Sequence, residues 1–193
     1  MILIYLILGH LLADFMLQPG KLIVMKNKSS FGIFLHVLIH FTVSAALLSP
    51  FIFNGYAWLL YIIGGIAVTH FLLDHCKILY EADKRHHNIV ETFLWDQAMH
   101  FFVISAAYFF LPKDILFLPA GLFYQYYQDA SIPIYFVLLI IITIVFEIYR
   151  FQYKREYDKK AKLRVNVIAM MFRGLNFSLI YGLILVLRAY PPF

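Results

Sequence analysis

Charged side chains are scarce in this sequence. Asp, Glu, Lys and Arg together make up 14% of the 193 residues, whereas a soluble domain usually carries about a quarter. Apolar residues account for 63%. Apolar runs recur along the whole length, and each is long enough to cross a bilayer, which takes about 20 helical residues. We therefore expect an integral membrane protein without a separate soluble domain.

Cysteine is almost absent as well. Cys76 is the single cysteine, so no disulfide forms within the chain. The net charge is +5, but basic loops are what membrane topology requires, and no basic and aromatic interleaving indicates a nucleic-acid partner. The first apolar run lacks the basic start and the small-residue cleavage site of a signal peptide. The sequence also lacks an H-E-x-x-H helix, a G-x-S-x-G elbow and a P-loop.

The apolar runs predict an all-α membrane protein with about six transmembrane helices. Their approximate ranges are 1–18, 31–53, 56–80, 91–111, 132–153 and 165–190. We divide the chain into a bundle over 1–111 and a second part over 112–193. The second part begins with a long aromatic segment, expected to lie at the membrane interface, and adds two further transmembrane helices.

Lysine and arginine indicate the orientation of these helices. They gather in the loops that follow the first, third and fifth helices, whereas the opposite loops carry only Lys113. Because positively charged loops stay on the cytoplasmic side, we expect both termini outside the cytoplasm.

The first four helices carry a repeated polar pattern. Each helix has a pair of His or Asp residues four positions apart: His10 with Asp14, His36 with His40, His70 with Asp74, and Asp96 with His100. The last two pairs follow the first two at a constant step of 60 residues. The spacing predicts a duplicated helical hairpin, with repeats of about 1–53 and 56–111. Both copies start on the same side, so they form a parallel repeat that builds a four-helix bundle.

The polar pairs predict a metal site in the cytoplasmic half of the membrane. Residues four apart share one helix face, so all eight side chains converge in the bundle. Unpaired carboxylates are costly in hydrocarbon, and a divalent cation neutralises them. Imidazole and carboxylate suit zinc, manganese or iron, and eight ligands are enough for two ions. A hydrogen-bonded polar core, a bis-histidine haem site and a proton relay remain alternative interpretations.

Further polar residues lie near this cluster or at its depth. Gln18 and Gln97 are expected to hydrogen-bond ligands and orient them. Lys21, Lys77 and Arg173 are candidates for holding an anionic substrate. Arg173 lies inside the last apolar run, where an arginine normally has a partner, and pairing with Glu147 or with one of the aspartates is the alternative.

The motif string resembles a family of small bacterial membrane proteins, domain of unknown function 3307. The resemblance rests on G-H-L-L-A-D-F-x-L-Q from Gly9 to Gln18, then H-x-x-x-H, H-x-x-x-D-x-x-K and D-Q-x-x-H, and it covers about the first 110 residues. It implies a multi-pass protein of the bacterial plasma (inner) membrane. It does not indicate a particular activity. A looser similarity of type links the chain to membrane-bound metal-dependent hydrolases.

Our functional hypothesis is a membrane-embedded, metal-dependent hydrolase of a phosphorylated or lipid-linked substrate. Two metal ions can polarise a phosphoryl or acyl oxygen and generate hydroxide near neutral pH. The alternatives are a divalent-cation transporter or channel, a di-iron membrane oxidase, and a non-enzymatic membrane subunit whose metal holds the bundle together. Membrane lipid is an expected partner, and a homo-oligomer is a further expectation.

Overall fold

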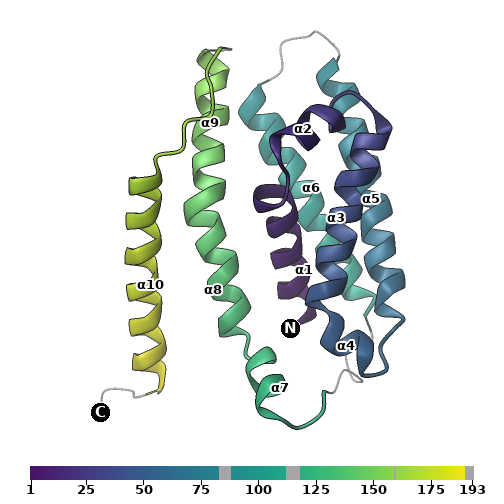
Figure 1. Ribbon diagram of the computed structural model, residues 1–193, viewed down its shortest axis with the longest axis vertical. Helices are drawn as coiled ribbons and strands as arrows, with labels where there is room; N and C mark the ends of the chain where they lie inside the picture. The colour runs from purple at the N-terminus through teal and green to yellow at the C-terminus, as the bar shows by residue number, and fades with distance from the viewer. Residues whose placement is uncertain (83–87, 112–117, 159, 190–193) are drawn as a thin grey trace.

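The structure is a computed structural model that describes residues 1–82, 88–111, 118–158 and 160–189 (Figure 1). The described residues are helical and contain no strand. Of the basic loop residues that indicate the orientation, Lys84, Arg85, Lys113 and Lys159 lie outside the described ranges. The all-α prediction is confirmed.

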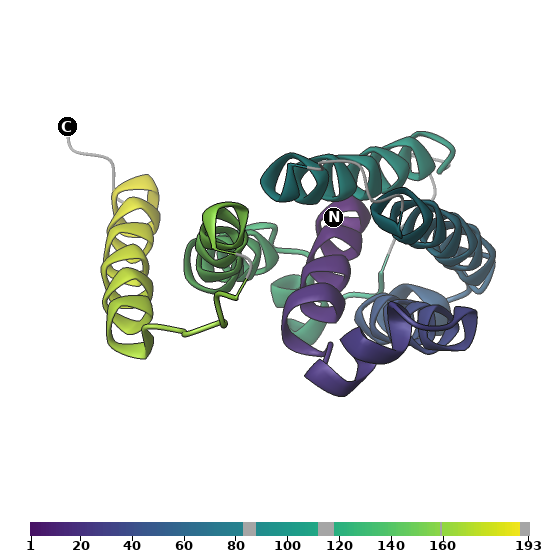
Figure 2. The same ribbon diagram turned by 90° about the horizontal axis from the view of Figure 1, so that it is seen from above.

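Four long helices enclose the core of the molecule. They are α1 (Ile2–Leu11), α3 (Ser30–Leu47), α5 (Leu59–Ala82) and α6 (Ile89–Phe109). Each packs on the next in the order α1, α3, α5, α6, and α6 returns to α1. Seen from above, the four form a closed ring (Figure 2). Buried leucines, isoleucines and aromatic residues from α1, α5 and α6 fill one end of this ring.

The first predicted helix, 1–18, corresponds to Ile2–Met16, and the chain bends sharply after it. After α1, a π-helical turn runs over Leu12–Met16, and Pro19 then separates it from the short helix α2 (Gly20–Lys26). The helical segments Ile2–Met16 and Gly20–Lys26 meet at 97°. Figure 1 shows α2 lying across the end of the bundle. The predicted ranges left residues 19–30 outside any helix, whereas the structure forms α2 there and buries Leu22 in it.

The second predicted helix is split in two. The structure ends α3 at Leu47 and starts α4 (Ser49–Phe53) after it, whereas we expected one helix over 31–53. Pro50 explains the break, because proline lacks the amide hydrogen that a continuous helix needs and crowds the preceding turn. Asn54 then donates to the Pro50 carbonyl at 2.7 Å and ends α4.

The remaining helices lie outside the ring. After the short helix α7 (Leu122–Tyr127), a long helix runs through α8 (Ser131–Ile140), a π-helical turn at Ile141–Val145 and α9 (Phe146–Tyr157). Its α8 part packs on α1 and its α9 part on α6. The last helix, α10 (Val167–Ala189), packs mainly on this long helix and forms the outer edge (Figures 1 and 2).

Four helices are long and apolar enough to cross a membrane. They are Ser30–Leu47, Leu59–Ala82, Ser131–Tyr157 and Val167–Ala189. The bent pair of α1 and α2 adds a fifth when it is counted as one span. Helix α6 does not reach the same apolar character, because Glu91, Asp96, Gln97 and His100 lower its hydropathy. These helices are compatible with a membrane protein.

Candidate metal centre

The predicted polar residues meet inside the ring of four helices. His10 lies at the end of α1, Asp14 in the π-helical turn, and the other pairs lie on α3, α5 and α6. All five histidines among the eight predicted ligands are buried, with at most 6% of the surface of any of them exposed. Burial of this many polar rings requires partners, and the rings supply them to one another and to the aspartates.

Four residues from three helices bring one ligand atom each to a single point. They are Asp14, His36, His40 and His70, whose ligand atoms all lie within 4.8 Å of one another. The Nε2 atom of His36 is 3.2 Å from His40 Nε2 and 3.3 Å from His70 Nε2. Asp14 Oδ1 lies 3.1 Å from His36 Nε2 and 3.0 Å from His40 Nε2. We call these four residues the first group.

The spacing within the first group fits a coordinated ion. Zinc–nitrogen bonds of about 2.0–2.1 Å in a tetrahedron place neighbouring ligand atoms about 3.3 Å apart. The separations of 3.0–3.3 Å given above are close to this value. Imidazole and carboxylate are also the ligand types that transition metals prefer. The first group therefore has the ligand types of a possible metal site, and four of its six atom pairs have the matching spacing.

A second group adjoins the first and shares one residue with it. His70, Asp74 and His100 also bring their ligand atoms within 4.8 Å of one another. His70 Nε2 lies 3.4 Å from Asp74 Oδ2 and faces His36 Nε2 as well. One imidazole nitrogen binds one ion, so His70 cannot serve both groups through this atom. A second ion therefore needs another ligand in place of His70.

Two buried ring nitrogens beside the second group have no hydrogen-bond partner among the described residues. His100 donates from Nδ1 to the Asp96 carbonyl at 2.7 Å, which leaves Nε2 with a free lone pair. His10 lies 3.3 Å from Gln97 Oε1 through Nε2, which leaves Nδ1 free in the same way. A metal-bound histidine usually donates its other N–H to a carbonyl or a carboxylate. Both rings have this arrangement, and of the two only His100 belongs to a group of converging ligand atoms.

Both predicted glutamines contact the cluster. Gln97 donates from Nε2 to Asp14 Oδ2 and to Asp96 Oδ2, each at 3.2 Å. The Gln18 amide lies 3.3 Å from His36 Nδ1. Because an amide can present either its oxygen or its nitrogen, Gln18 is able to accept from His36 Nδ1–H and leave Nε2 for an ion. These contacts fix the orientation of the rings and carboxylates.

Two lysines are paired with carboxylates of the cluster. Lys26 Nζ lies 2.7 Å from Asp74 Oδ2, and Lys77 Nζ lies 2.9 Å from Asp96 Oδ2. Asp96 belongs to neither group of ligand atoms. From the sequence, Lys26 is one of several basic residues that could bind a phosphate group, and we favoured a topology signal or a lipid contact for them. Its position in the segment between the first two apolar runs gave no sign that α2 folds back over the cluster.

The other two proposed substrate residues lie apart from the cluster. Lys21 is exposed on α2. Arg173, on the outer helix α10, donates to Glu147 Oε1 at 2.6 Å and to the Ile142 carbonyl at 3.0 Å. That carbonyl belongs to the second π-helical turn, where the wider helix leaves backbone oxygens available. The structure thus places Arg173 in the structural pairing that we kept as its alternative.

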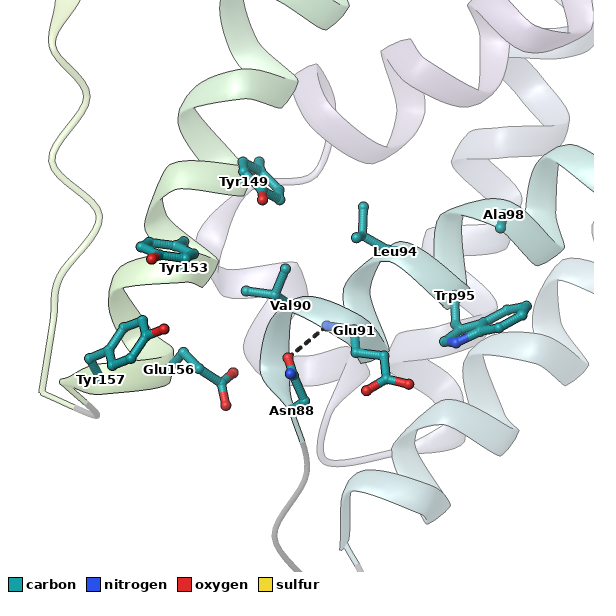
Figure 3. A pocket seen from close by; sticks show the side chains of 10 residues that line it. All are labelled: Asn88, Val90, Glu91, Leu94, Trp95, Ala98, Tyr149, Tyr153, Glu156 and Tyr157. Carbon is teal, nitrogen blue, oxygen red and sulfur yellow. Dashed lines mark hydrogen bonds between the residues drawn. The ribbon is translucent and has the colours of Figure 1, made fainter.

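Two larger cavities lie along α6, outside the ring. One, of about 490 Å³, lies between α6 and α9, with Tyr149, Tyr153 and Tyr157 on the α9 side and Leu94 on the α6 side (Figure 3). None of the eight predicted ligands lines it. The other, of about 400 Å³, lies between α5 and α6, and both Lys77 and Asp96 line it. This second cavity therefore reaches Asp96, one of the eight predicted ligands.

The comparisons with known proteins agree with the motif. No curated protein and no solved structure matches the chain. A family model described as "Protein of unknown function (DUF3307)" matches residues 2–120, a range that includes all eight predicted ligands. The resemblance stated from the sequence is confirmed, and the chain belongs to this DUF3307 family.

Proposed function

We propose that this chain is a six-span protein of the bacterial plasma membrane, with both termini outside the cytoplasm and a duplicated hairpin in α1–α6. The equal geometry of equivalent pairs supports the duplication. His10 Nε2 lies 3.4 Å from Asp14 Oδ2, and His70 Nε2 lies 3.4 Å from Asp74 Oδ2. Reporter fusions test the orientation: a periplasmic reporter is active at either terminus, and a cytoplasmic reporter at either terminus contradicts it.

We propose that the first group binds a divalent metal ion and that a second ion binds Asp74 and His100. The free Nε2 atom of His100 and the convergence of the second group support the second ion. Four protein ligands fill a tetrahedral zinc site. Manganese and iron accept up to about six ligands, which leaves room for water and a substrate oxygen. We therefore favour manganese or iron over zinc for a working site.

We propose hydrolysis of a phosphorylated or lipid-linked substrate as the function. The convergence of Asp14, His36, His40 and His70 carries this proposal, because an ion held there acidifies bound water and polarises a phosphoryl or acyl oxygen. A free carboxylate or imidazole of the second group would accept the proton. The cavity between α5 and α6, which Asp96 lines, gives room for an apolar chain beside the cluster.

Ion transport is the second candidate, and one observation speaks against it. The side of the cluster that faces the core is closed by apolar residues, which leave a void of only about 10 Å³ bordered by Leu6, Ile63 and Ile104. An ion that crossed the membrane would have to pass through this apolar packing. A di-iron oxidase stays open as a third candidate, and iron in the purified protein would favour it.

Elemental mass spectrometry of the purified protein is the deciding experiment. We expect manganese, iron or zinc in the wild type and its loss in the double variant His36→Ala, His70→Ala. His75→Ala is the matched control, since His75 lies on α5 next to Asp74 but stacks on Phe71 instead. Release of phosphate from a long-chain alkyl phosphate in micelles then tests hydrolysis. Absence of metal from chelator-free protein would refute the metal proposal, and a loaded but inactive protein would refute hydrolysis of this substrate class.

A further inference from the structure

Lys26 brings a positive charge to the interior of the bundle. Its side chain is only 14% exposed, and Nζ lies 2.7 Å from Asp74 Oδ2. The same oxygen lies 3.4 Å from His70 Nε2 and 3.6 Å from His36 Nε2, two ligand atoms of the first group. The ammonium group is therefore next to the proposed ion, separated from its ligands by one carboxylate oxygen.

The backbone holds Lys26 in this place. Helix α2 ends against the start of α3, and a Cβ atom added at Gly32 would lie 2.2 Å from the Met25 carbonyl carbon and 2.4 Å from the Lys26 nitrogen. Only glycine permits this contact. The Ser29 side chain caps α3 by accepting from Gly32 N–H at 3.1 Å, which also fixes the connection. Lys26 is thus positioned by close packing rather than by a free loop.

Lys26 determines whether the centre around the ion is neutral or carries a net positive charge. Asp14, Asp74 and Asp96 contribute three negative charges, and Lys26 and Lys77 contribute two positive charges. One divalent ion in the first group then leaves one net positive charge. Without Lys26 the centre would be neutral. An anion that bridges the ion and an ammonium group would find both a ligand position and a charge-assisted hydrogen bond.

We propose that Lys26 forms, beside the ion of the first group, a binding site for a tetrahedral oxyanion of the phosphate type. Asp74 holds the ammonium group until the anion takes over part of this contact. The inference rests on the proposed function, because it needs an ion in the first group. It assigns to Lys26 the anion contact that we expected from Lys21 and Arg173.

Cobalt-loaded protein provides a test that does not need a substrate. Cobalt(II) bound by imidazole and carboxylate absorbs visible light, and inorganic phosphate that enters its coordination sphere changes the spectrum. We would titrate phosphate into the wild type, Lys26→Met, Lys26→Arg and Lys28→Met. Lys28 is the matched control, because it is exposed in the turn that follows α2.

We expect Lys26→Met to weaken phosphate binding at least tenfold while cobalt stays bound. Lys26→Arg should retain most of the affinity, because the charge remains, and Lys28→Met should match the wild type. Equal phosphate affinity in Lys26→Met and wild type overturns the inference and leaves Lys26 with a structural ion pair. Equal weakening by Lys28→Met overturns it as well, since general surface charge then explains the effect. A protein that binds no cobalt overturns both this inference and the proposed metal centre.

Discussion

The Nε2 atoms of His36 and His40 lie 3.2 Å apart on consecutive turns of α3, and both rings are buried. Asp14 Oδ1 faces both atoms, at 3.1 and 3.0 Å. Each ring nitrogen carries at most one proton, so hydrogen bonds alone satisfy only part of these contacts. An ion among them satisfies all of them at once.

The two groups of ligands should differ in their effect on metal affinity. We expect Asp14→Asn to weaken binding of the first ion by at least tenfold, because it removes a charged ligand that contacts two rings. His100→Ala should leave one ion bound, since His100 is not in the first group. Competition with a chelating dye measures both affinities. Loss of all metal in His100→Ala would show that the groups act as one site.

Gln97 should affect metal affinity although it is not a proposed ligand. It donates to Asp14 Oδ2 and Asp96 Oδ2, and its oxygen lies 3.3 Å from His10 Nε2. Removing groups that orient metal ligands typically lowers metal affinity by about 10–100-fold. We expect Gln97→Leu to show a loss in this range by dye competition. Gln128→Leu is the control, because the Gln128 side chain is exposed at the end of α7 and donates to the Tyr124 carbonyl. Unchanged affinity in Gln97→Leu would contradict a positioning role.

Gly32→Ala should displace the end of α2 from its contact with the start of α3. The added methyl group would overlap the backbone at Met25 and Lys26, so α2 must shift. We expect a stability loss of about 1–3 kcal/mol, the usual cost of overpacking. Thermal unfolding in detergent measures this loss, and the cobalt titration should show weaker phosphate binding with cobalt still bound. Gly64→Ala is the control, because a Cβ atom there meets open space. Equal behaviour of the two variants would refute the tight fit.

Arg173→Met should lower the stability of the outer helices and leave the metal content unchanged. Arg173 ties α10 to the long helix through Glu147 and the Ile142 carbonyl. We expect a loss of about 1–3 kcal/mol, the cost of leaving a buried polar group without its partner. Arg150 limits the effect, because it also bonds Glu147, at 3.2 Å. Thermal unfolding and elemental analysis check the two statements. A fall in metal content would show that α10 takes part in the site after all.

The sequence was sufficient to predict the cluster because its signal is periodic. Residues four apart on apolar helices point to one side, and the constant step of 60 residues joins the pairs. For Asp96 the periodic pattern is not sufficient. It has the right spacing, yet Lys77 holds its carboxylate at 2.9 Å, and only the packing of α5 on α6 reveals this pairing.

The path of the chain between residues 17 and 30 could not be predicted in the same way. Helix α2 is short, and its direction depends on Pro19 and on the contact at Gly32. Neither contributes a periodic pattern. The π-helical turn that contains Asp14 also escapes pattern analysis, because an inserted residue changes the phase of a helix without changing its composition. Such turns are frequent at functional sites, and here the turn bears a proposed ligand.

The first group draws its ligands from α1 with its π-helical turn, α3 and α5, so the complete set exists only when three separate helices are assembled. An ion that binds this assembled state and not its separated parts adds its binding free energy to the stability of the fold. The gain is about 2.7 kcal/mol when the free ion is at 100 times its dissociation constant. Metal supply would then govern how much of the protein survives quality control in the membrane, in addition to any chemistry that the ion performs.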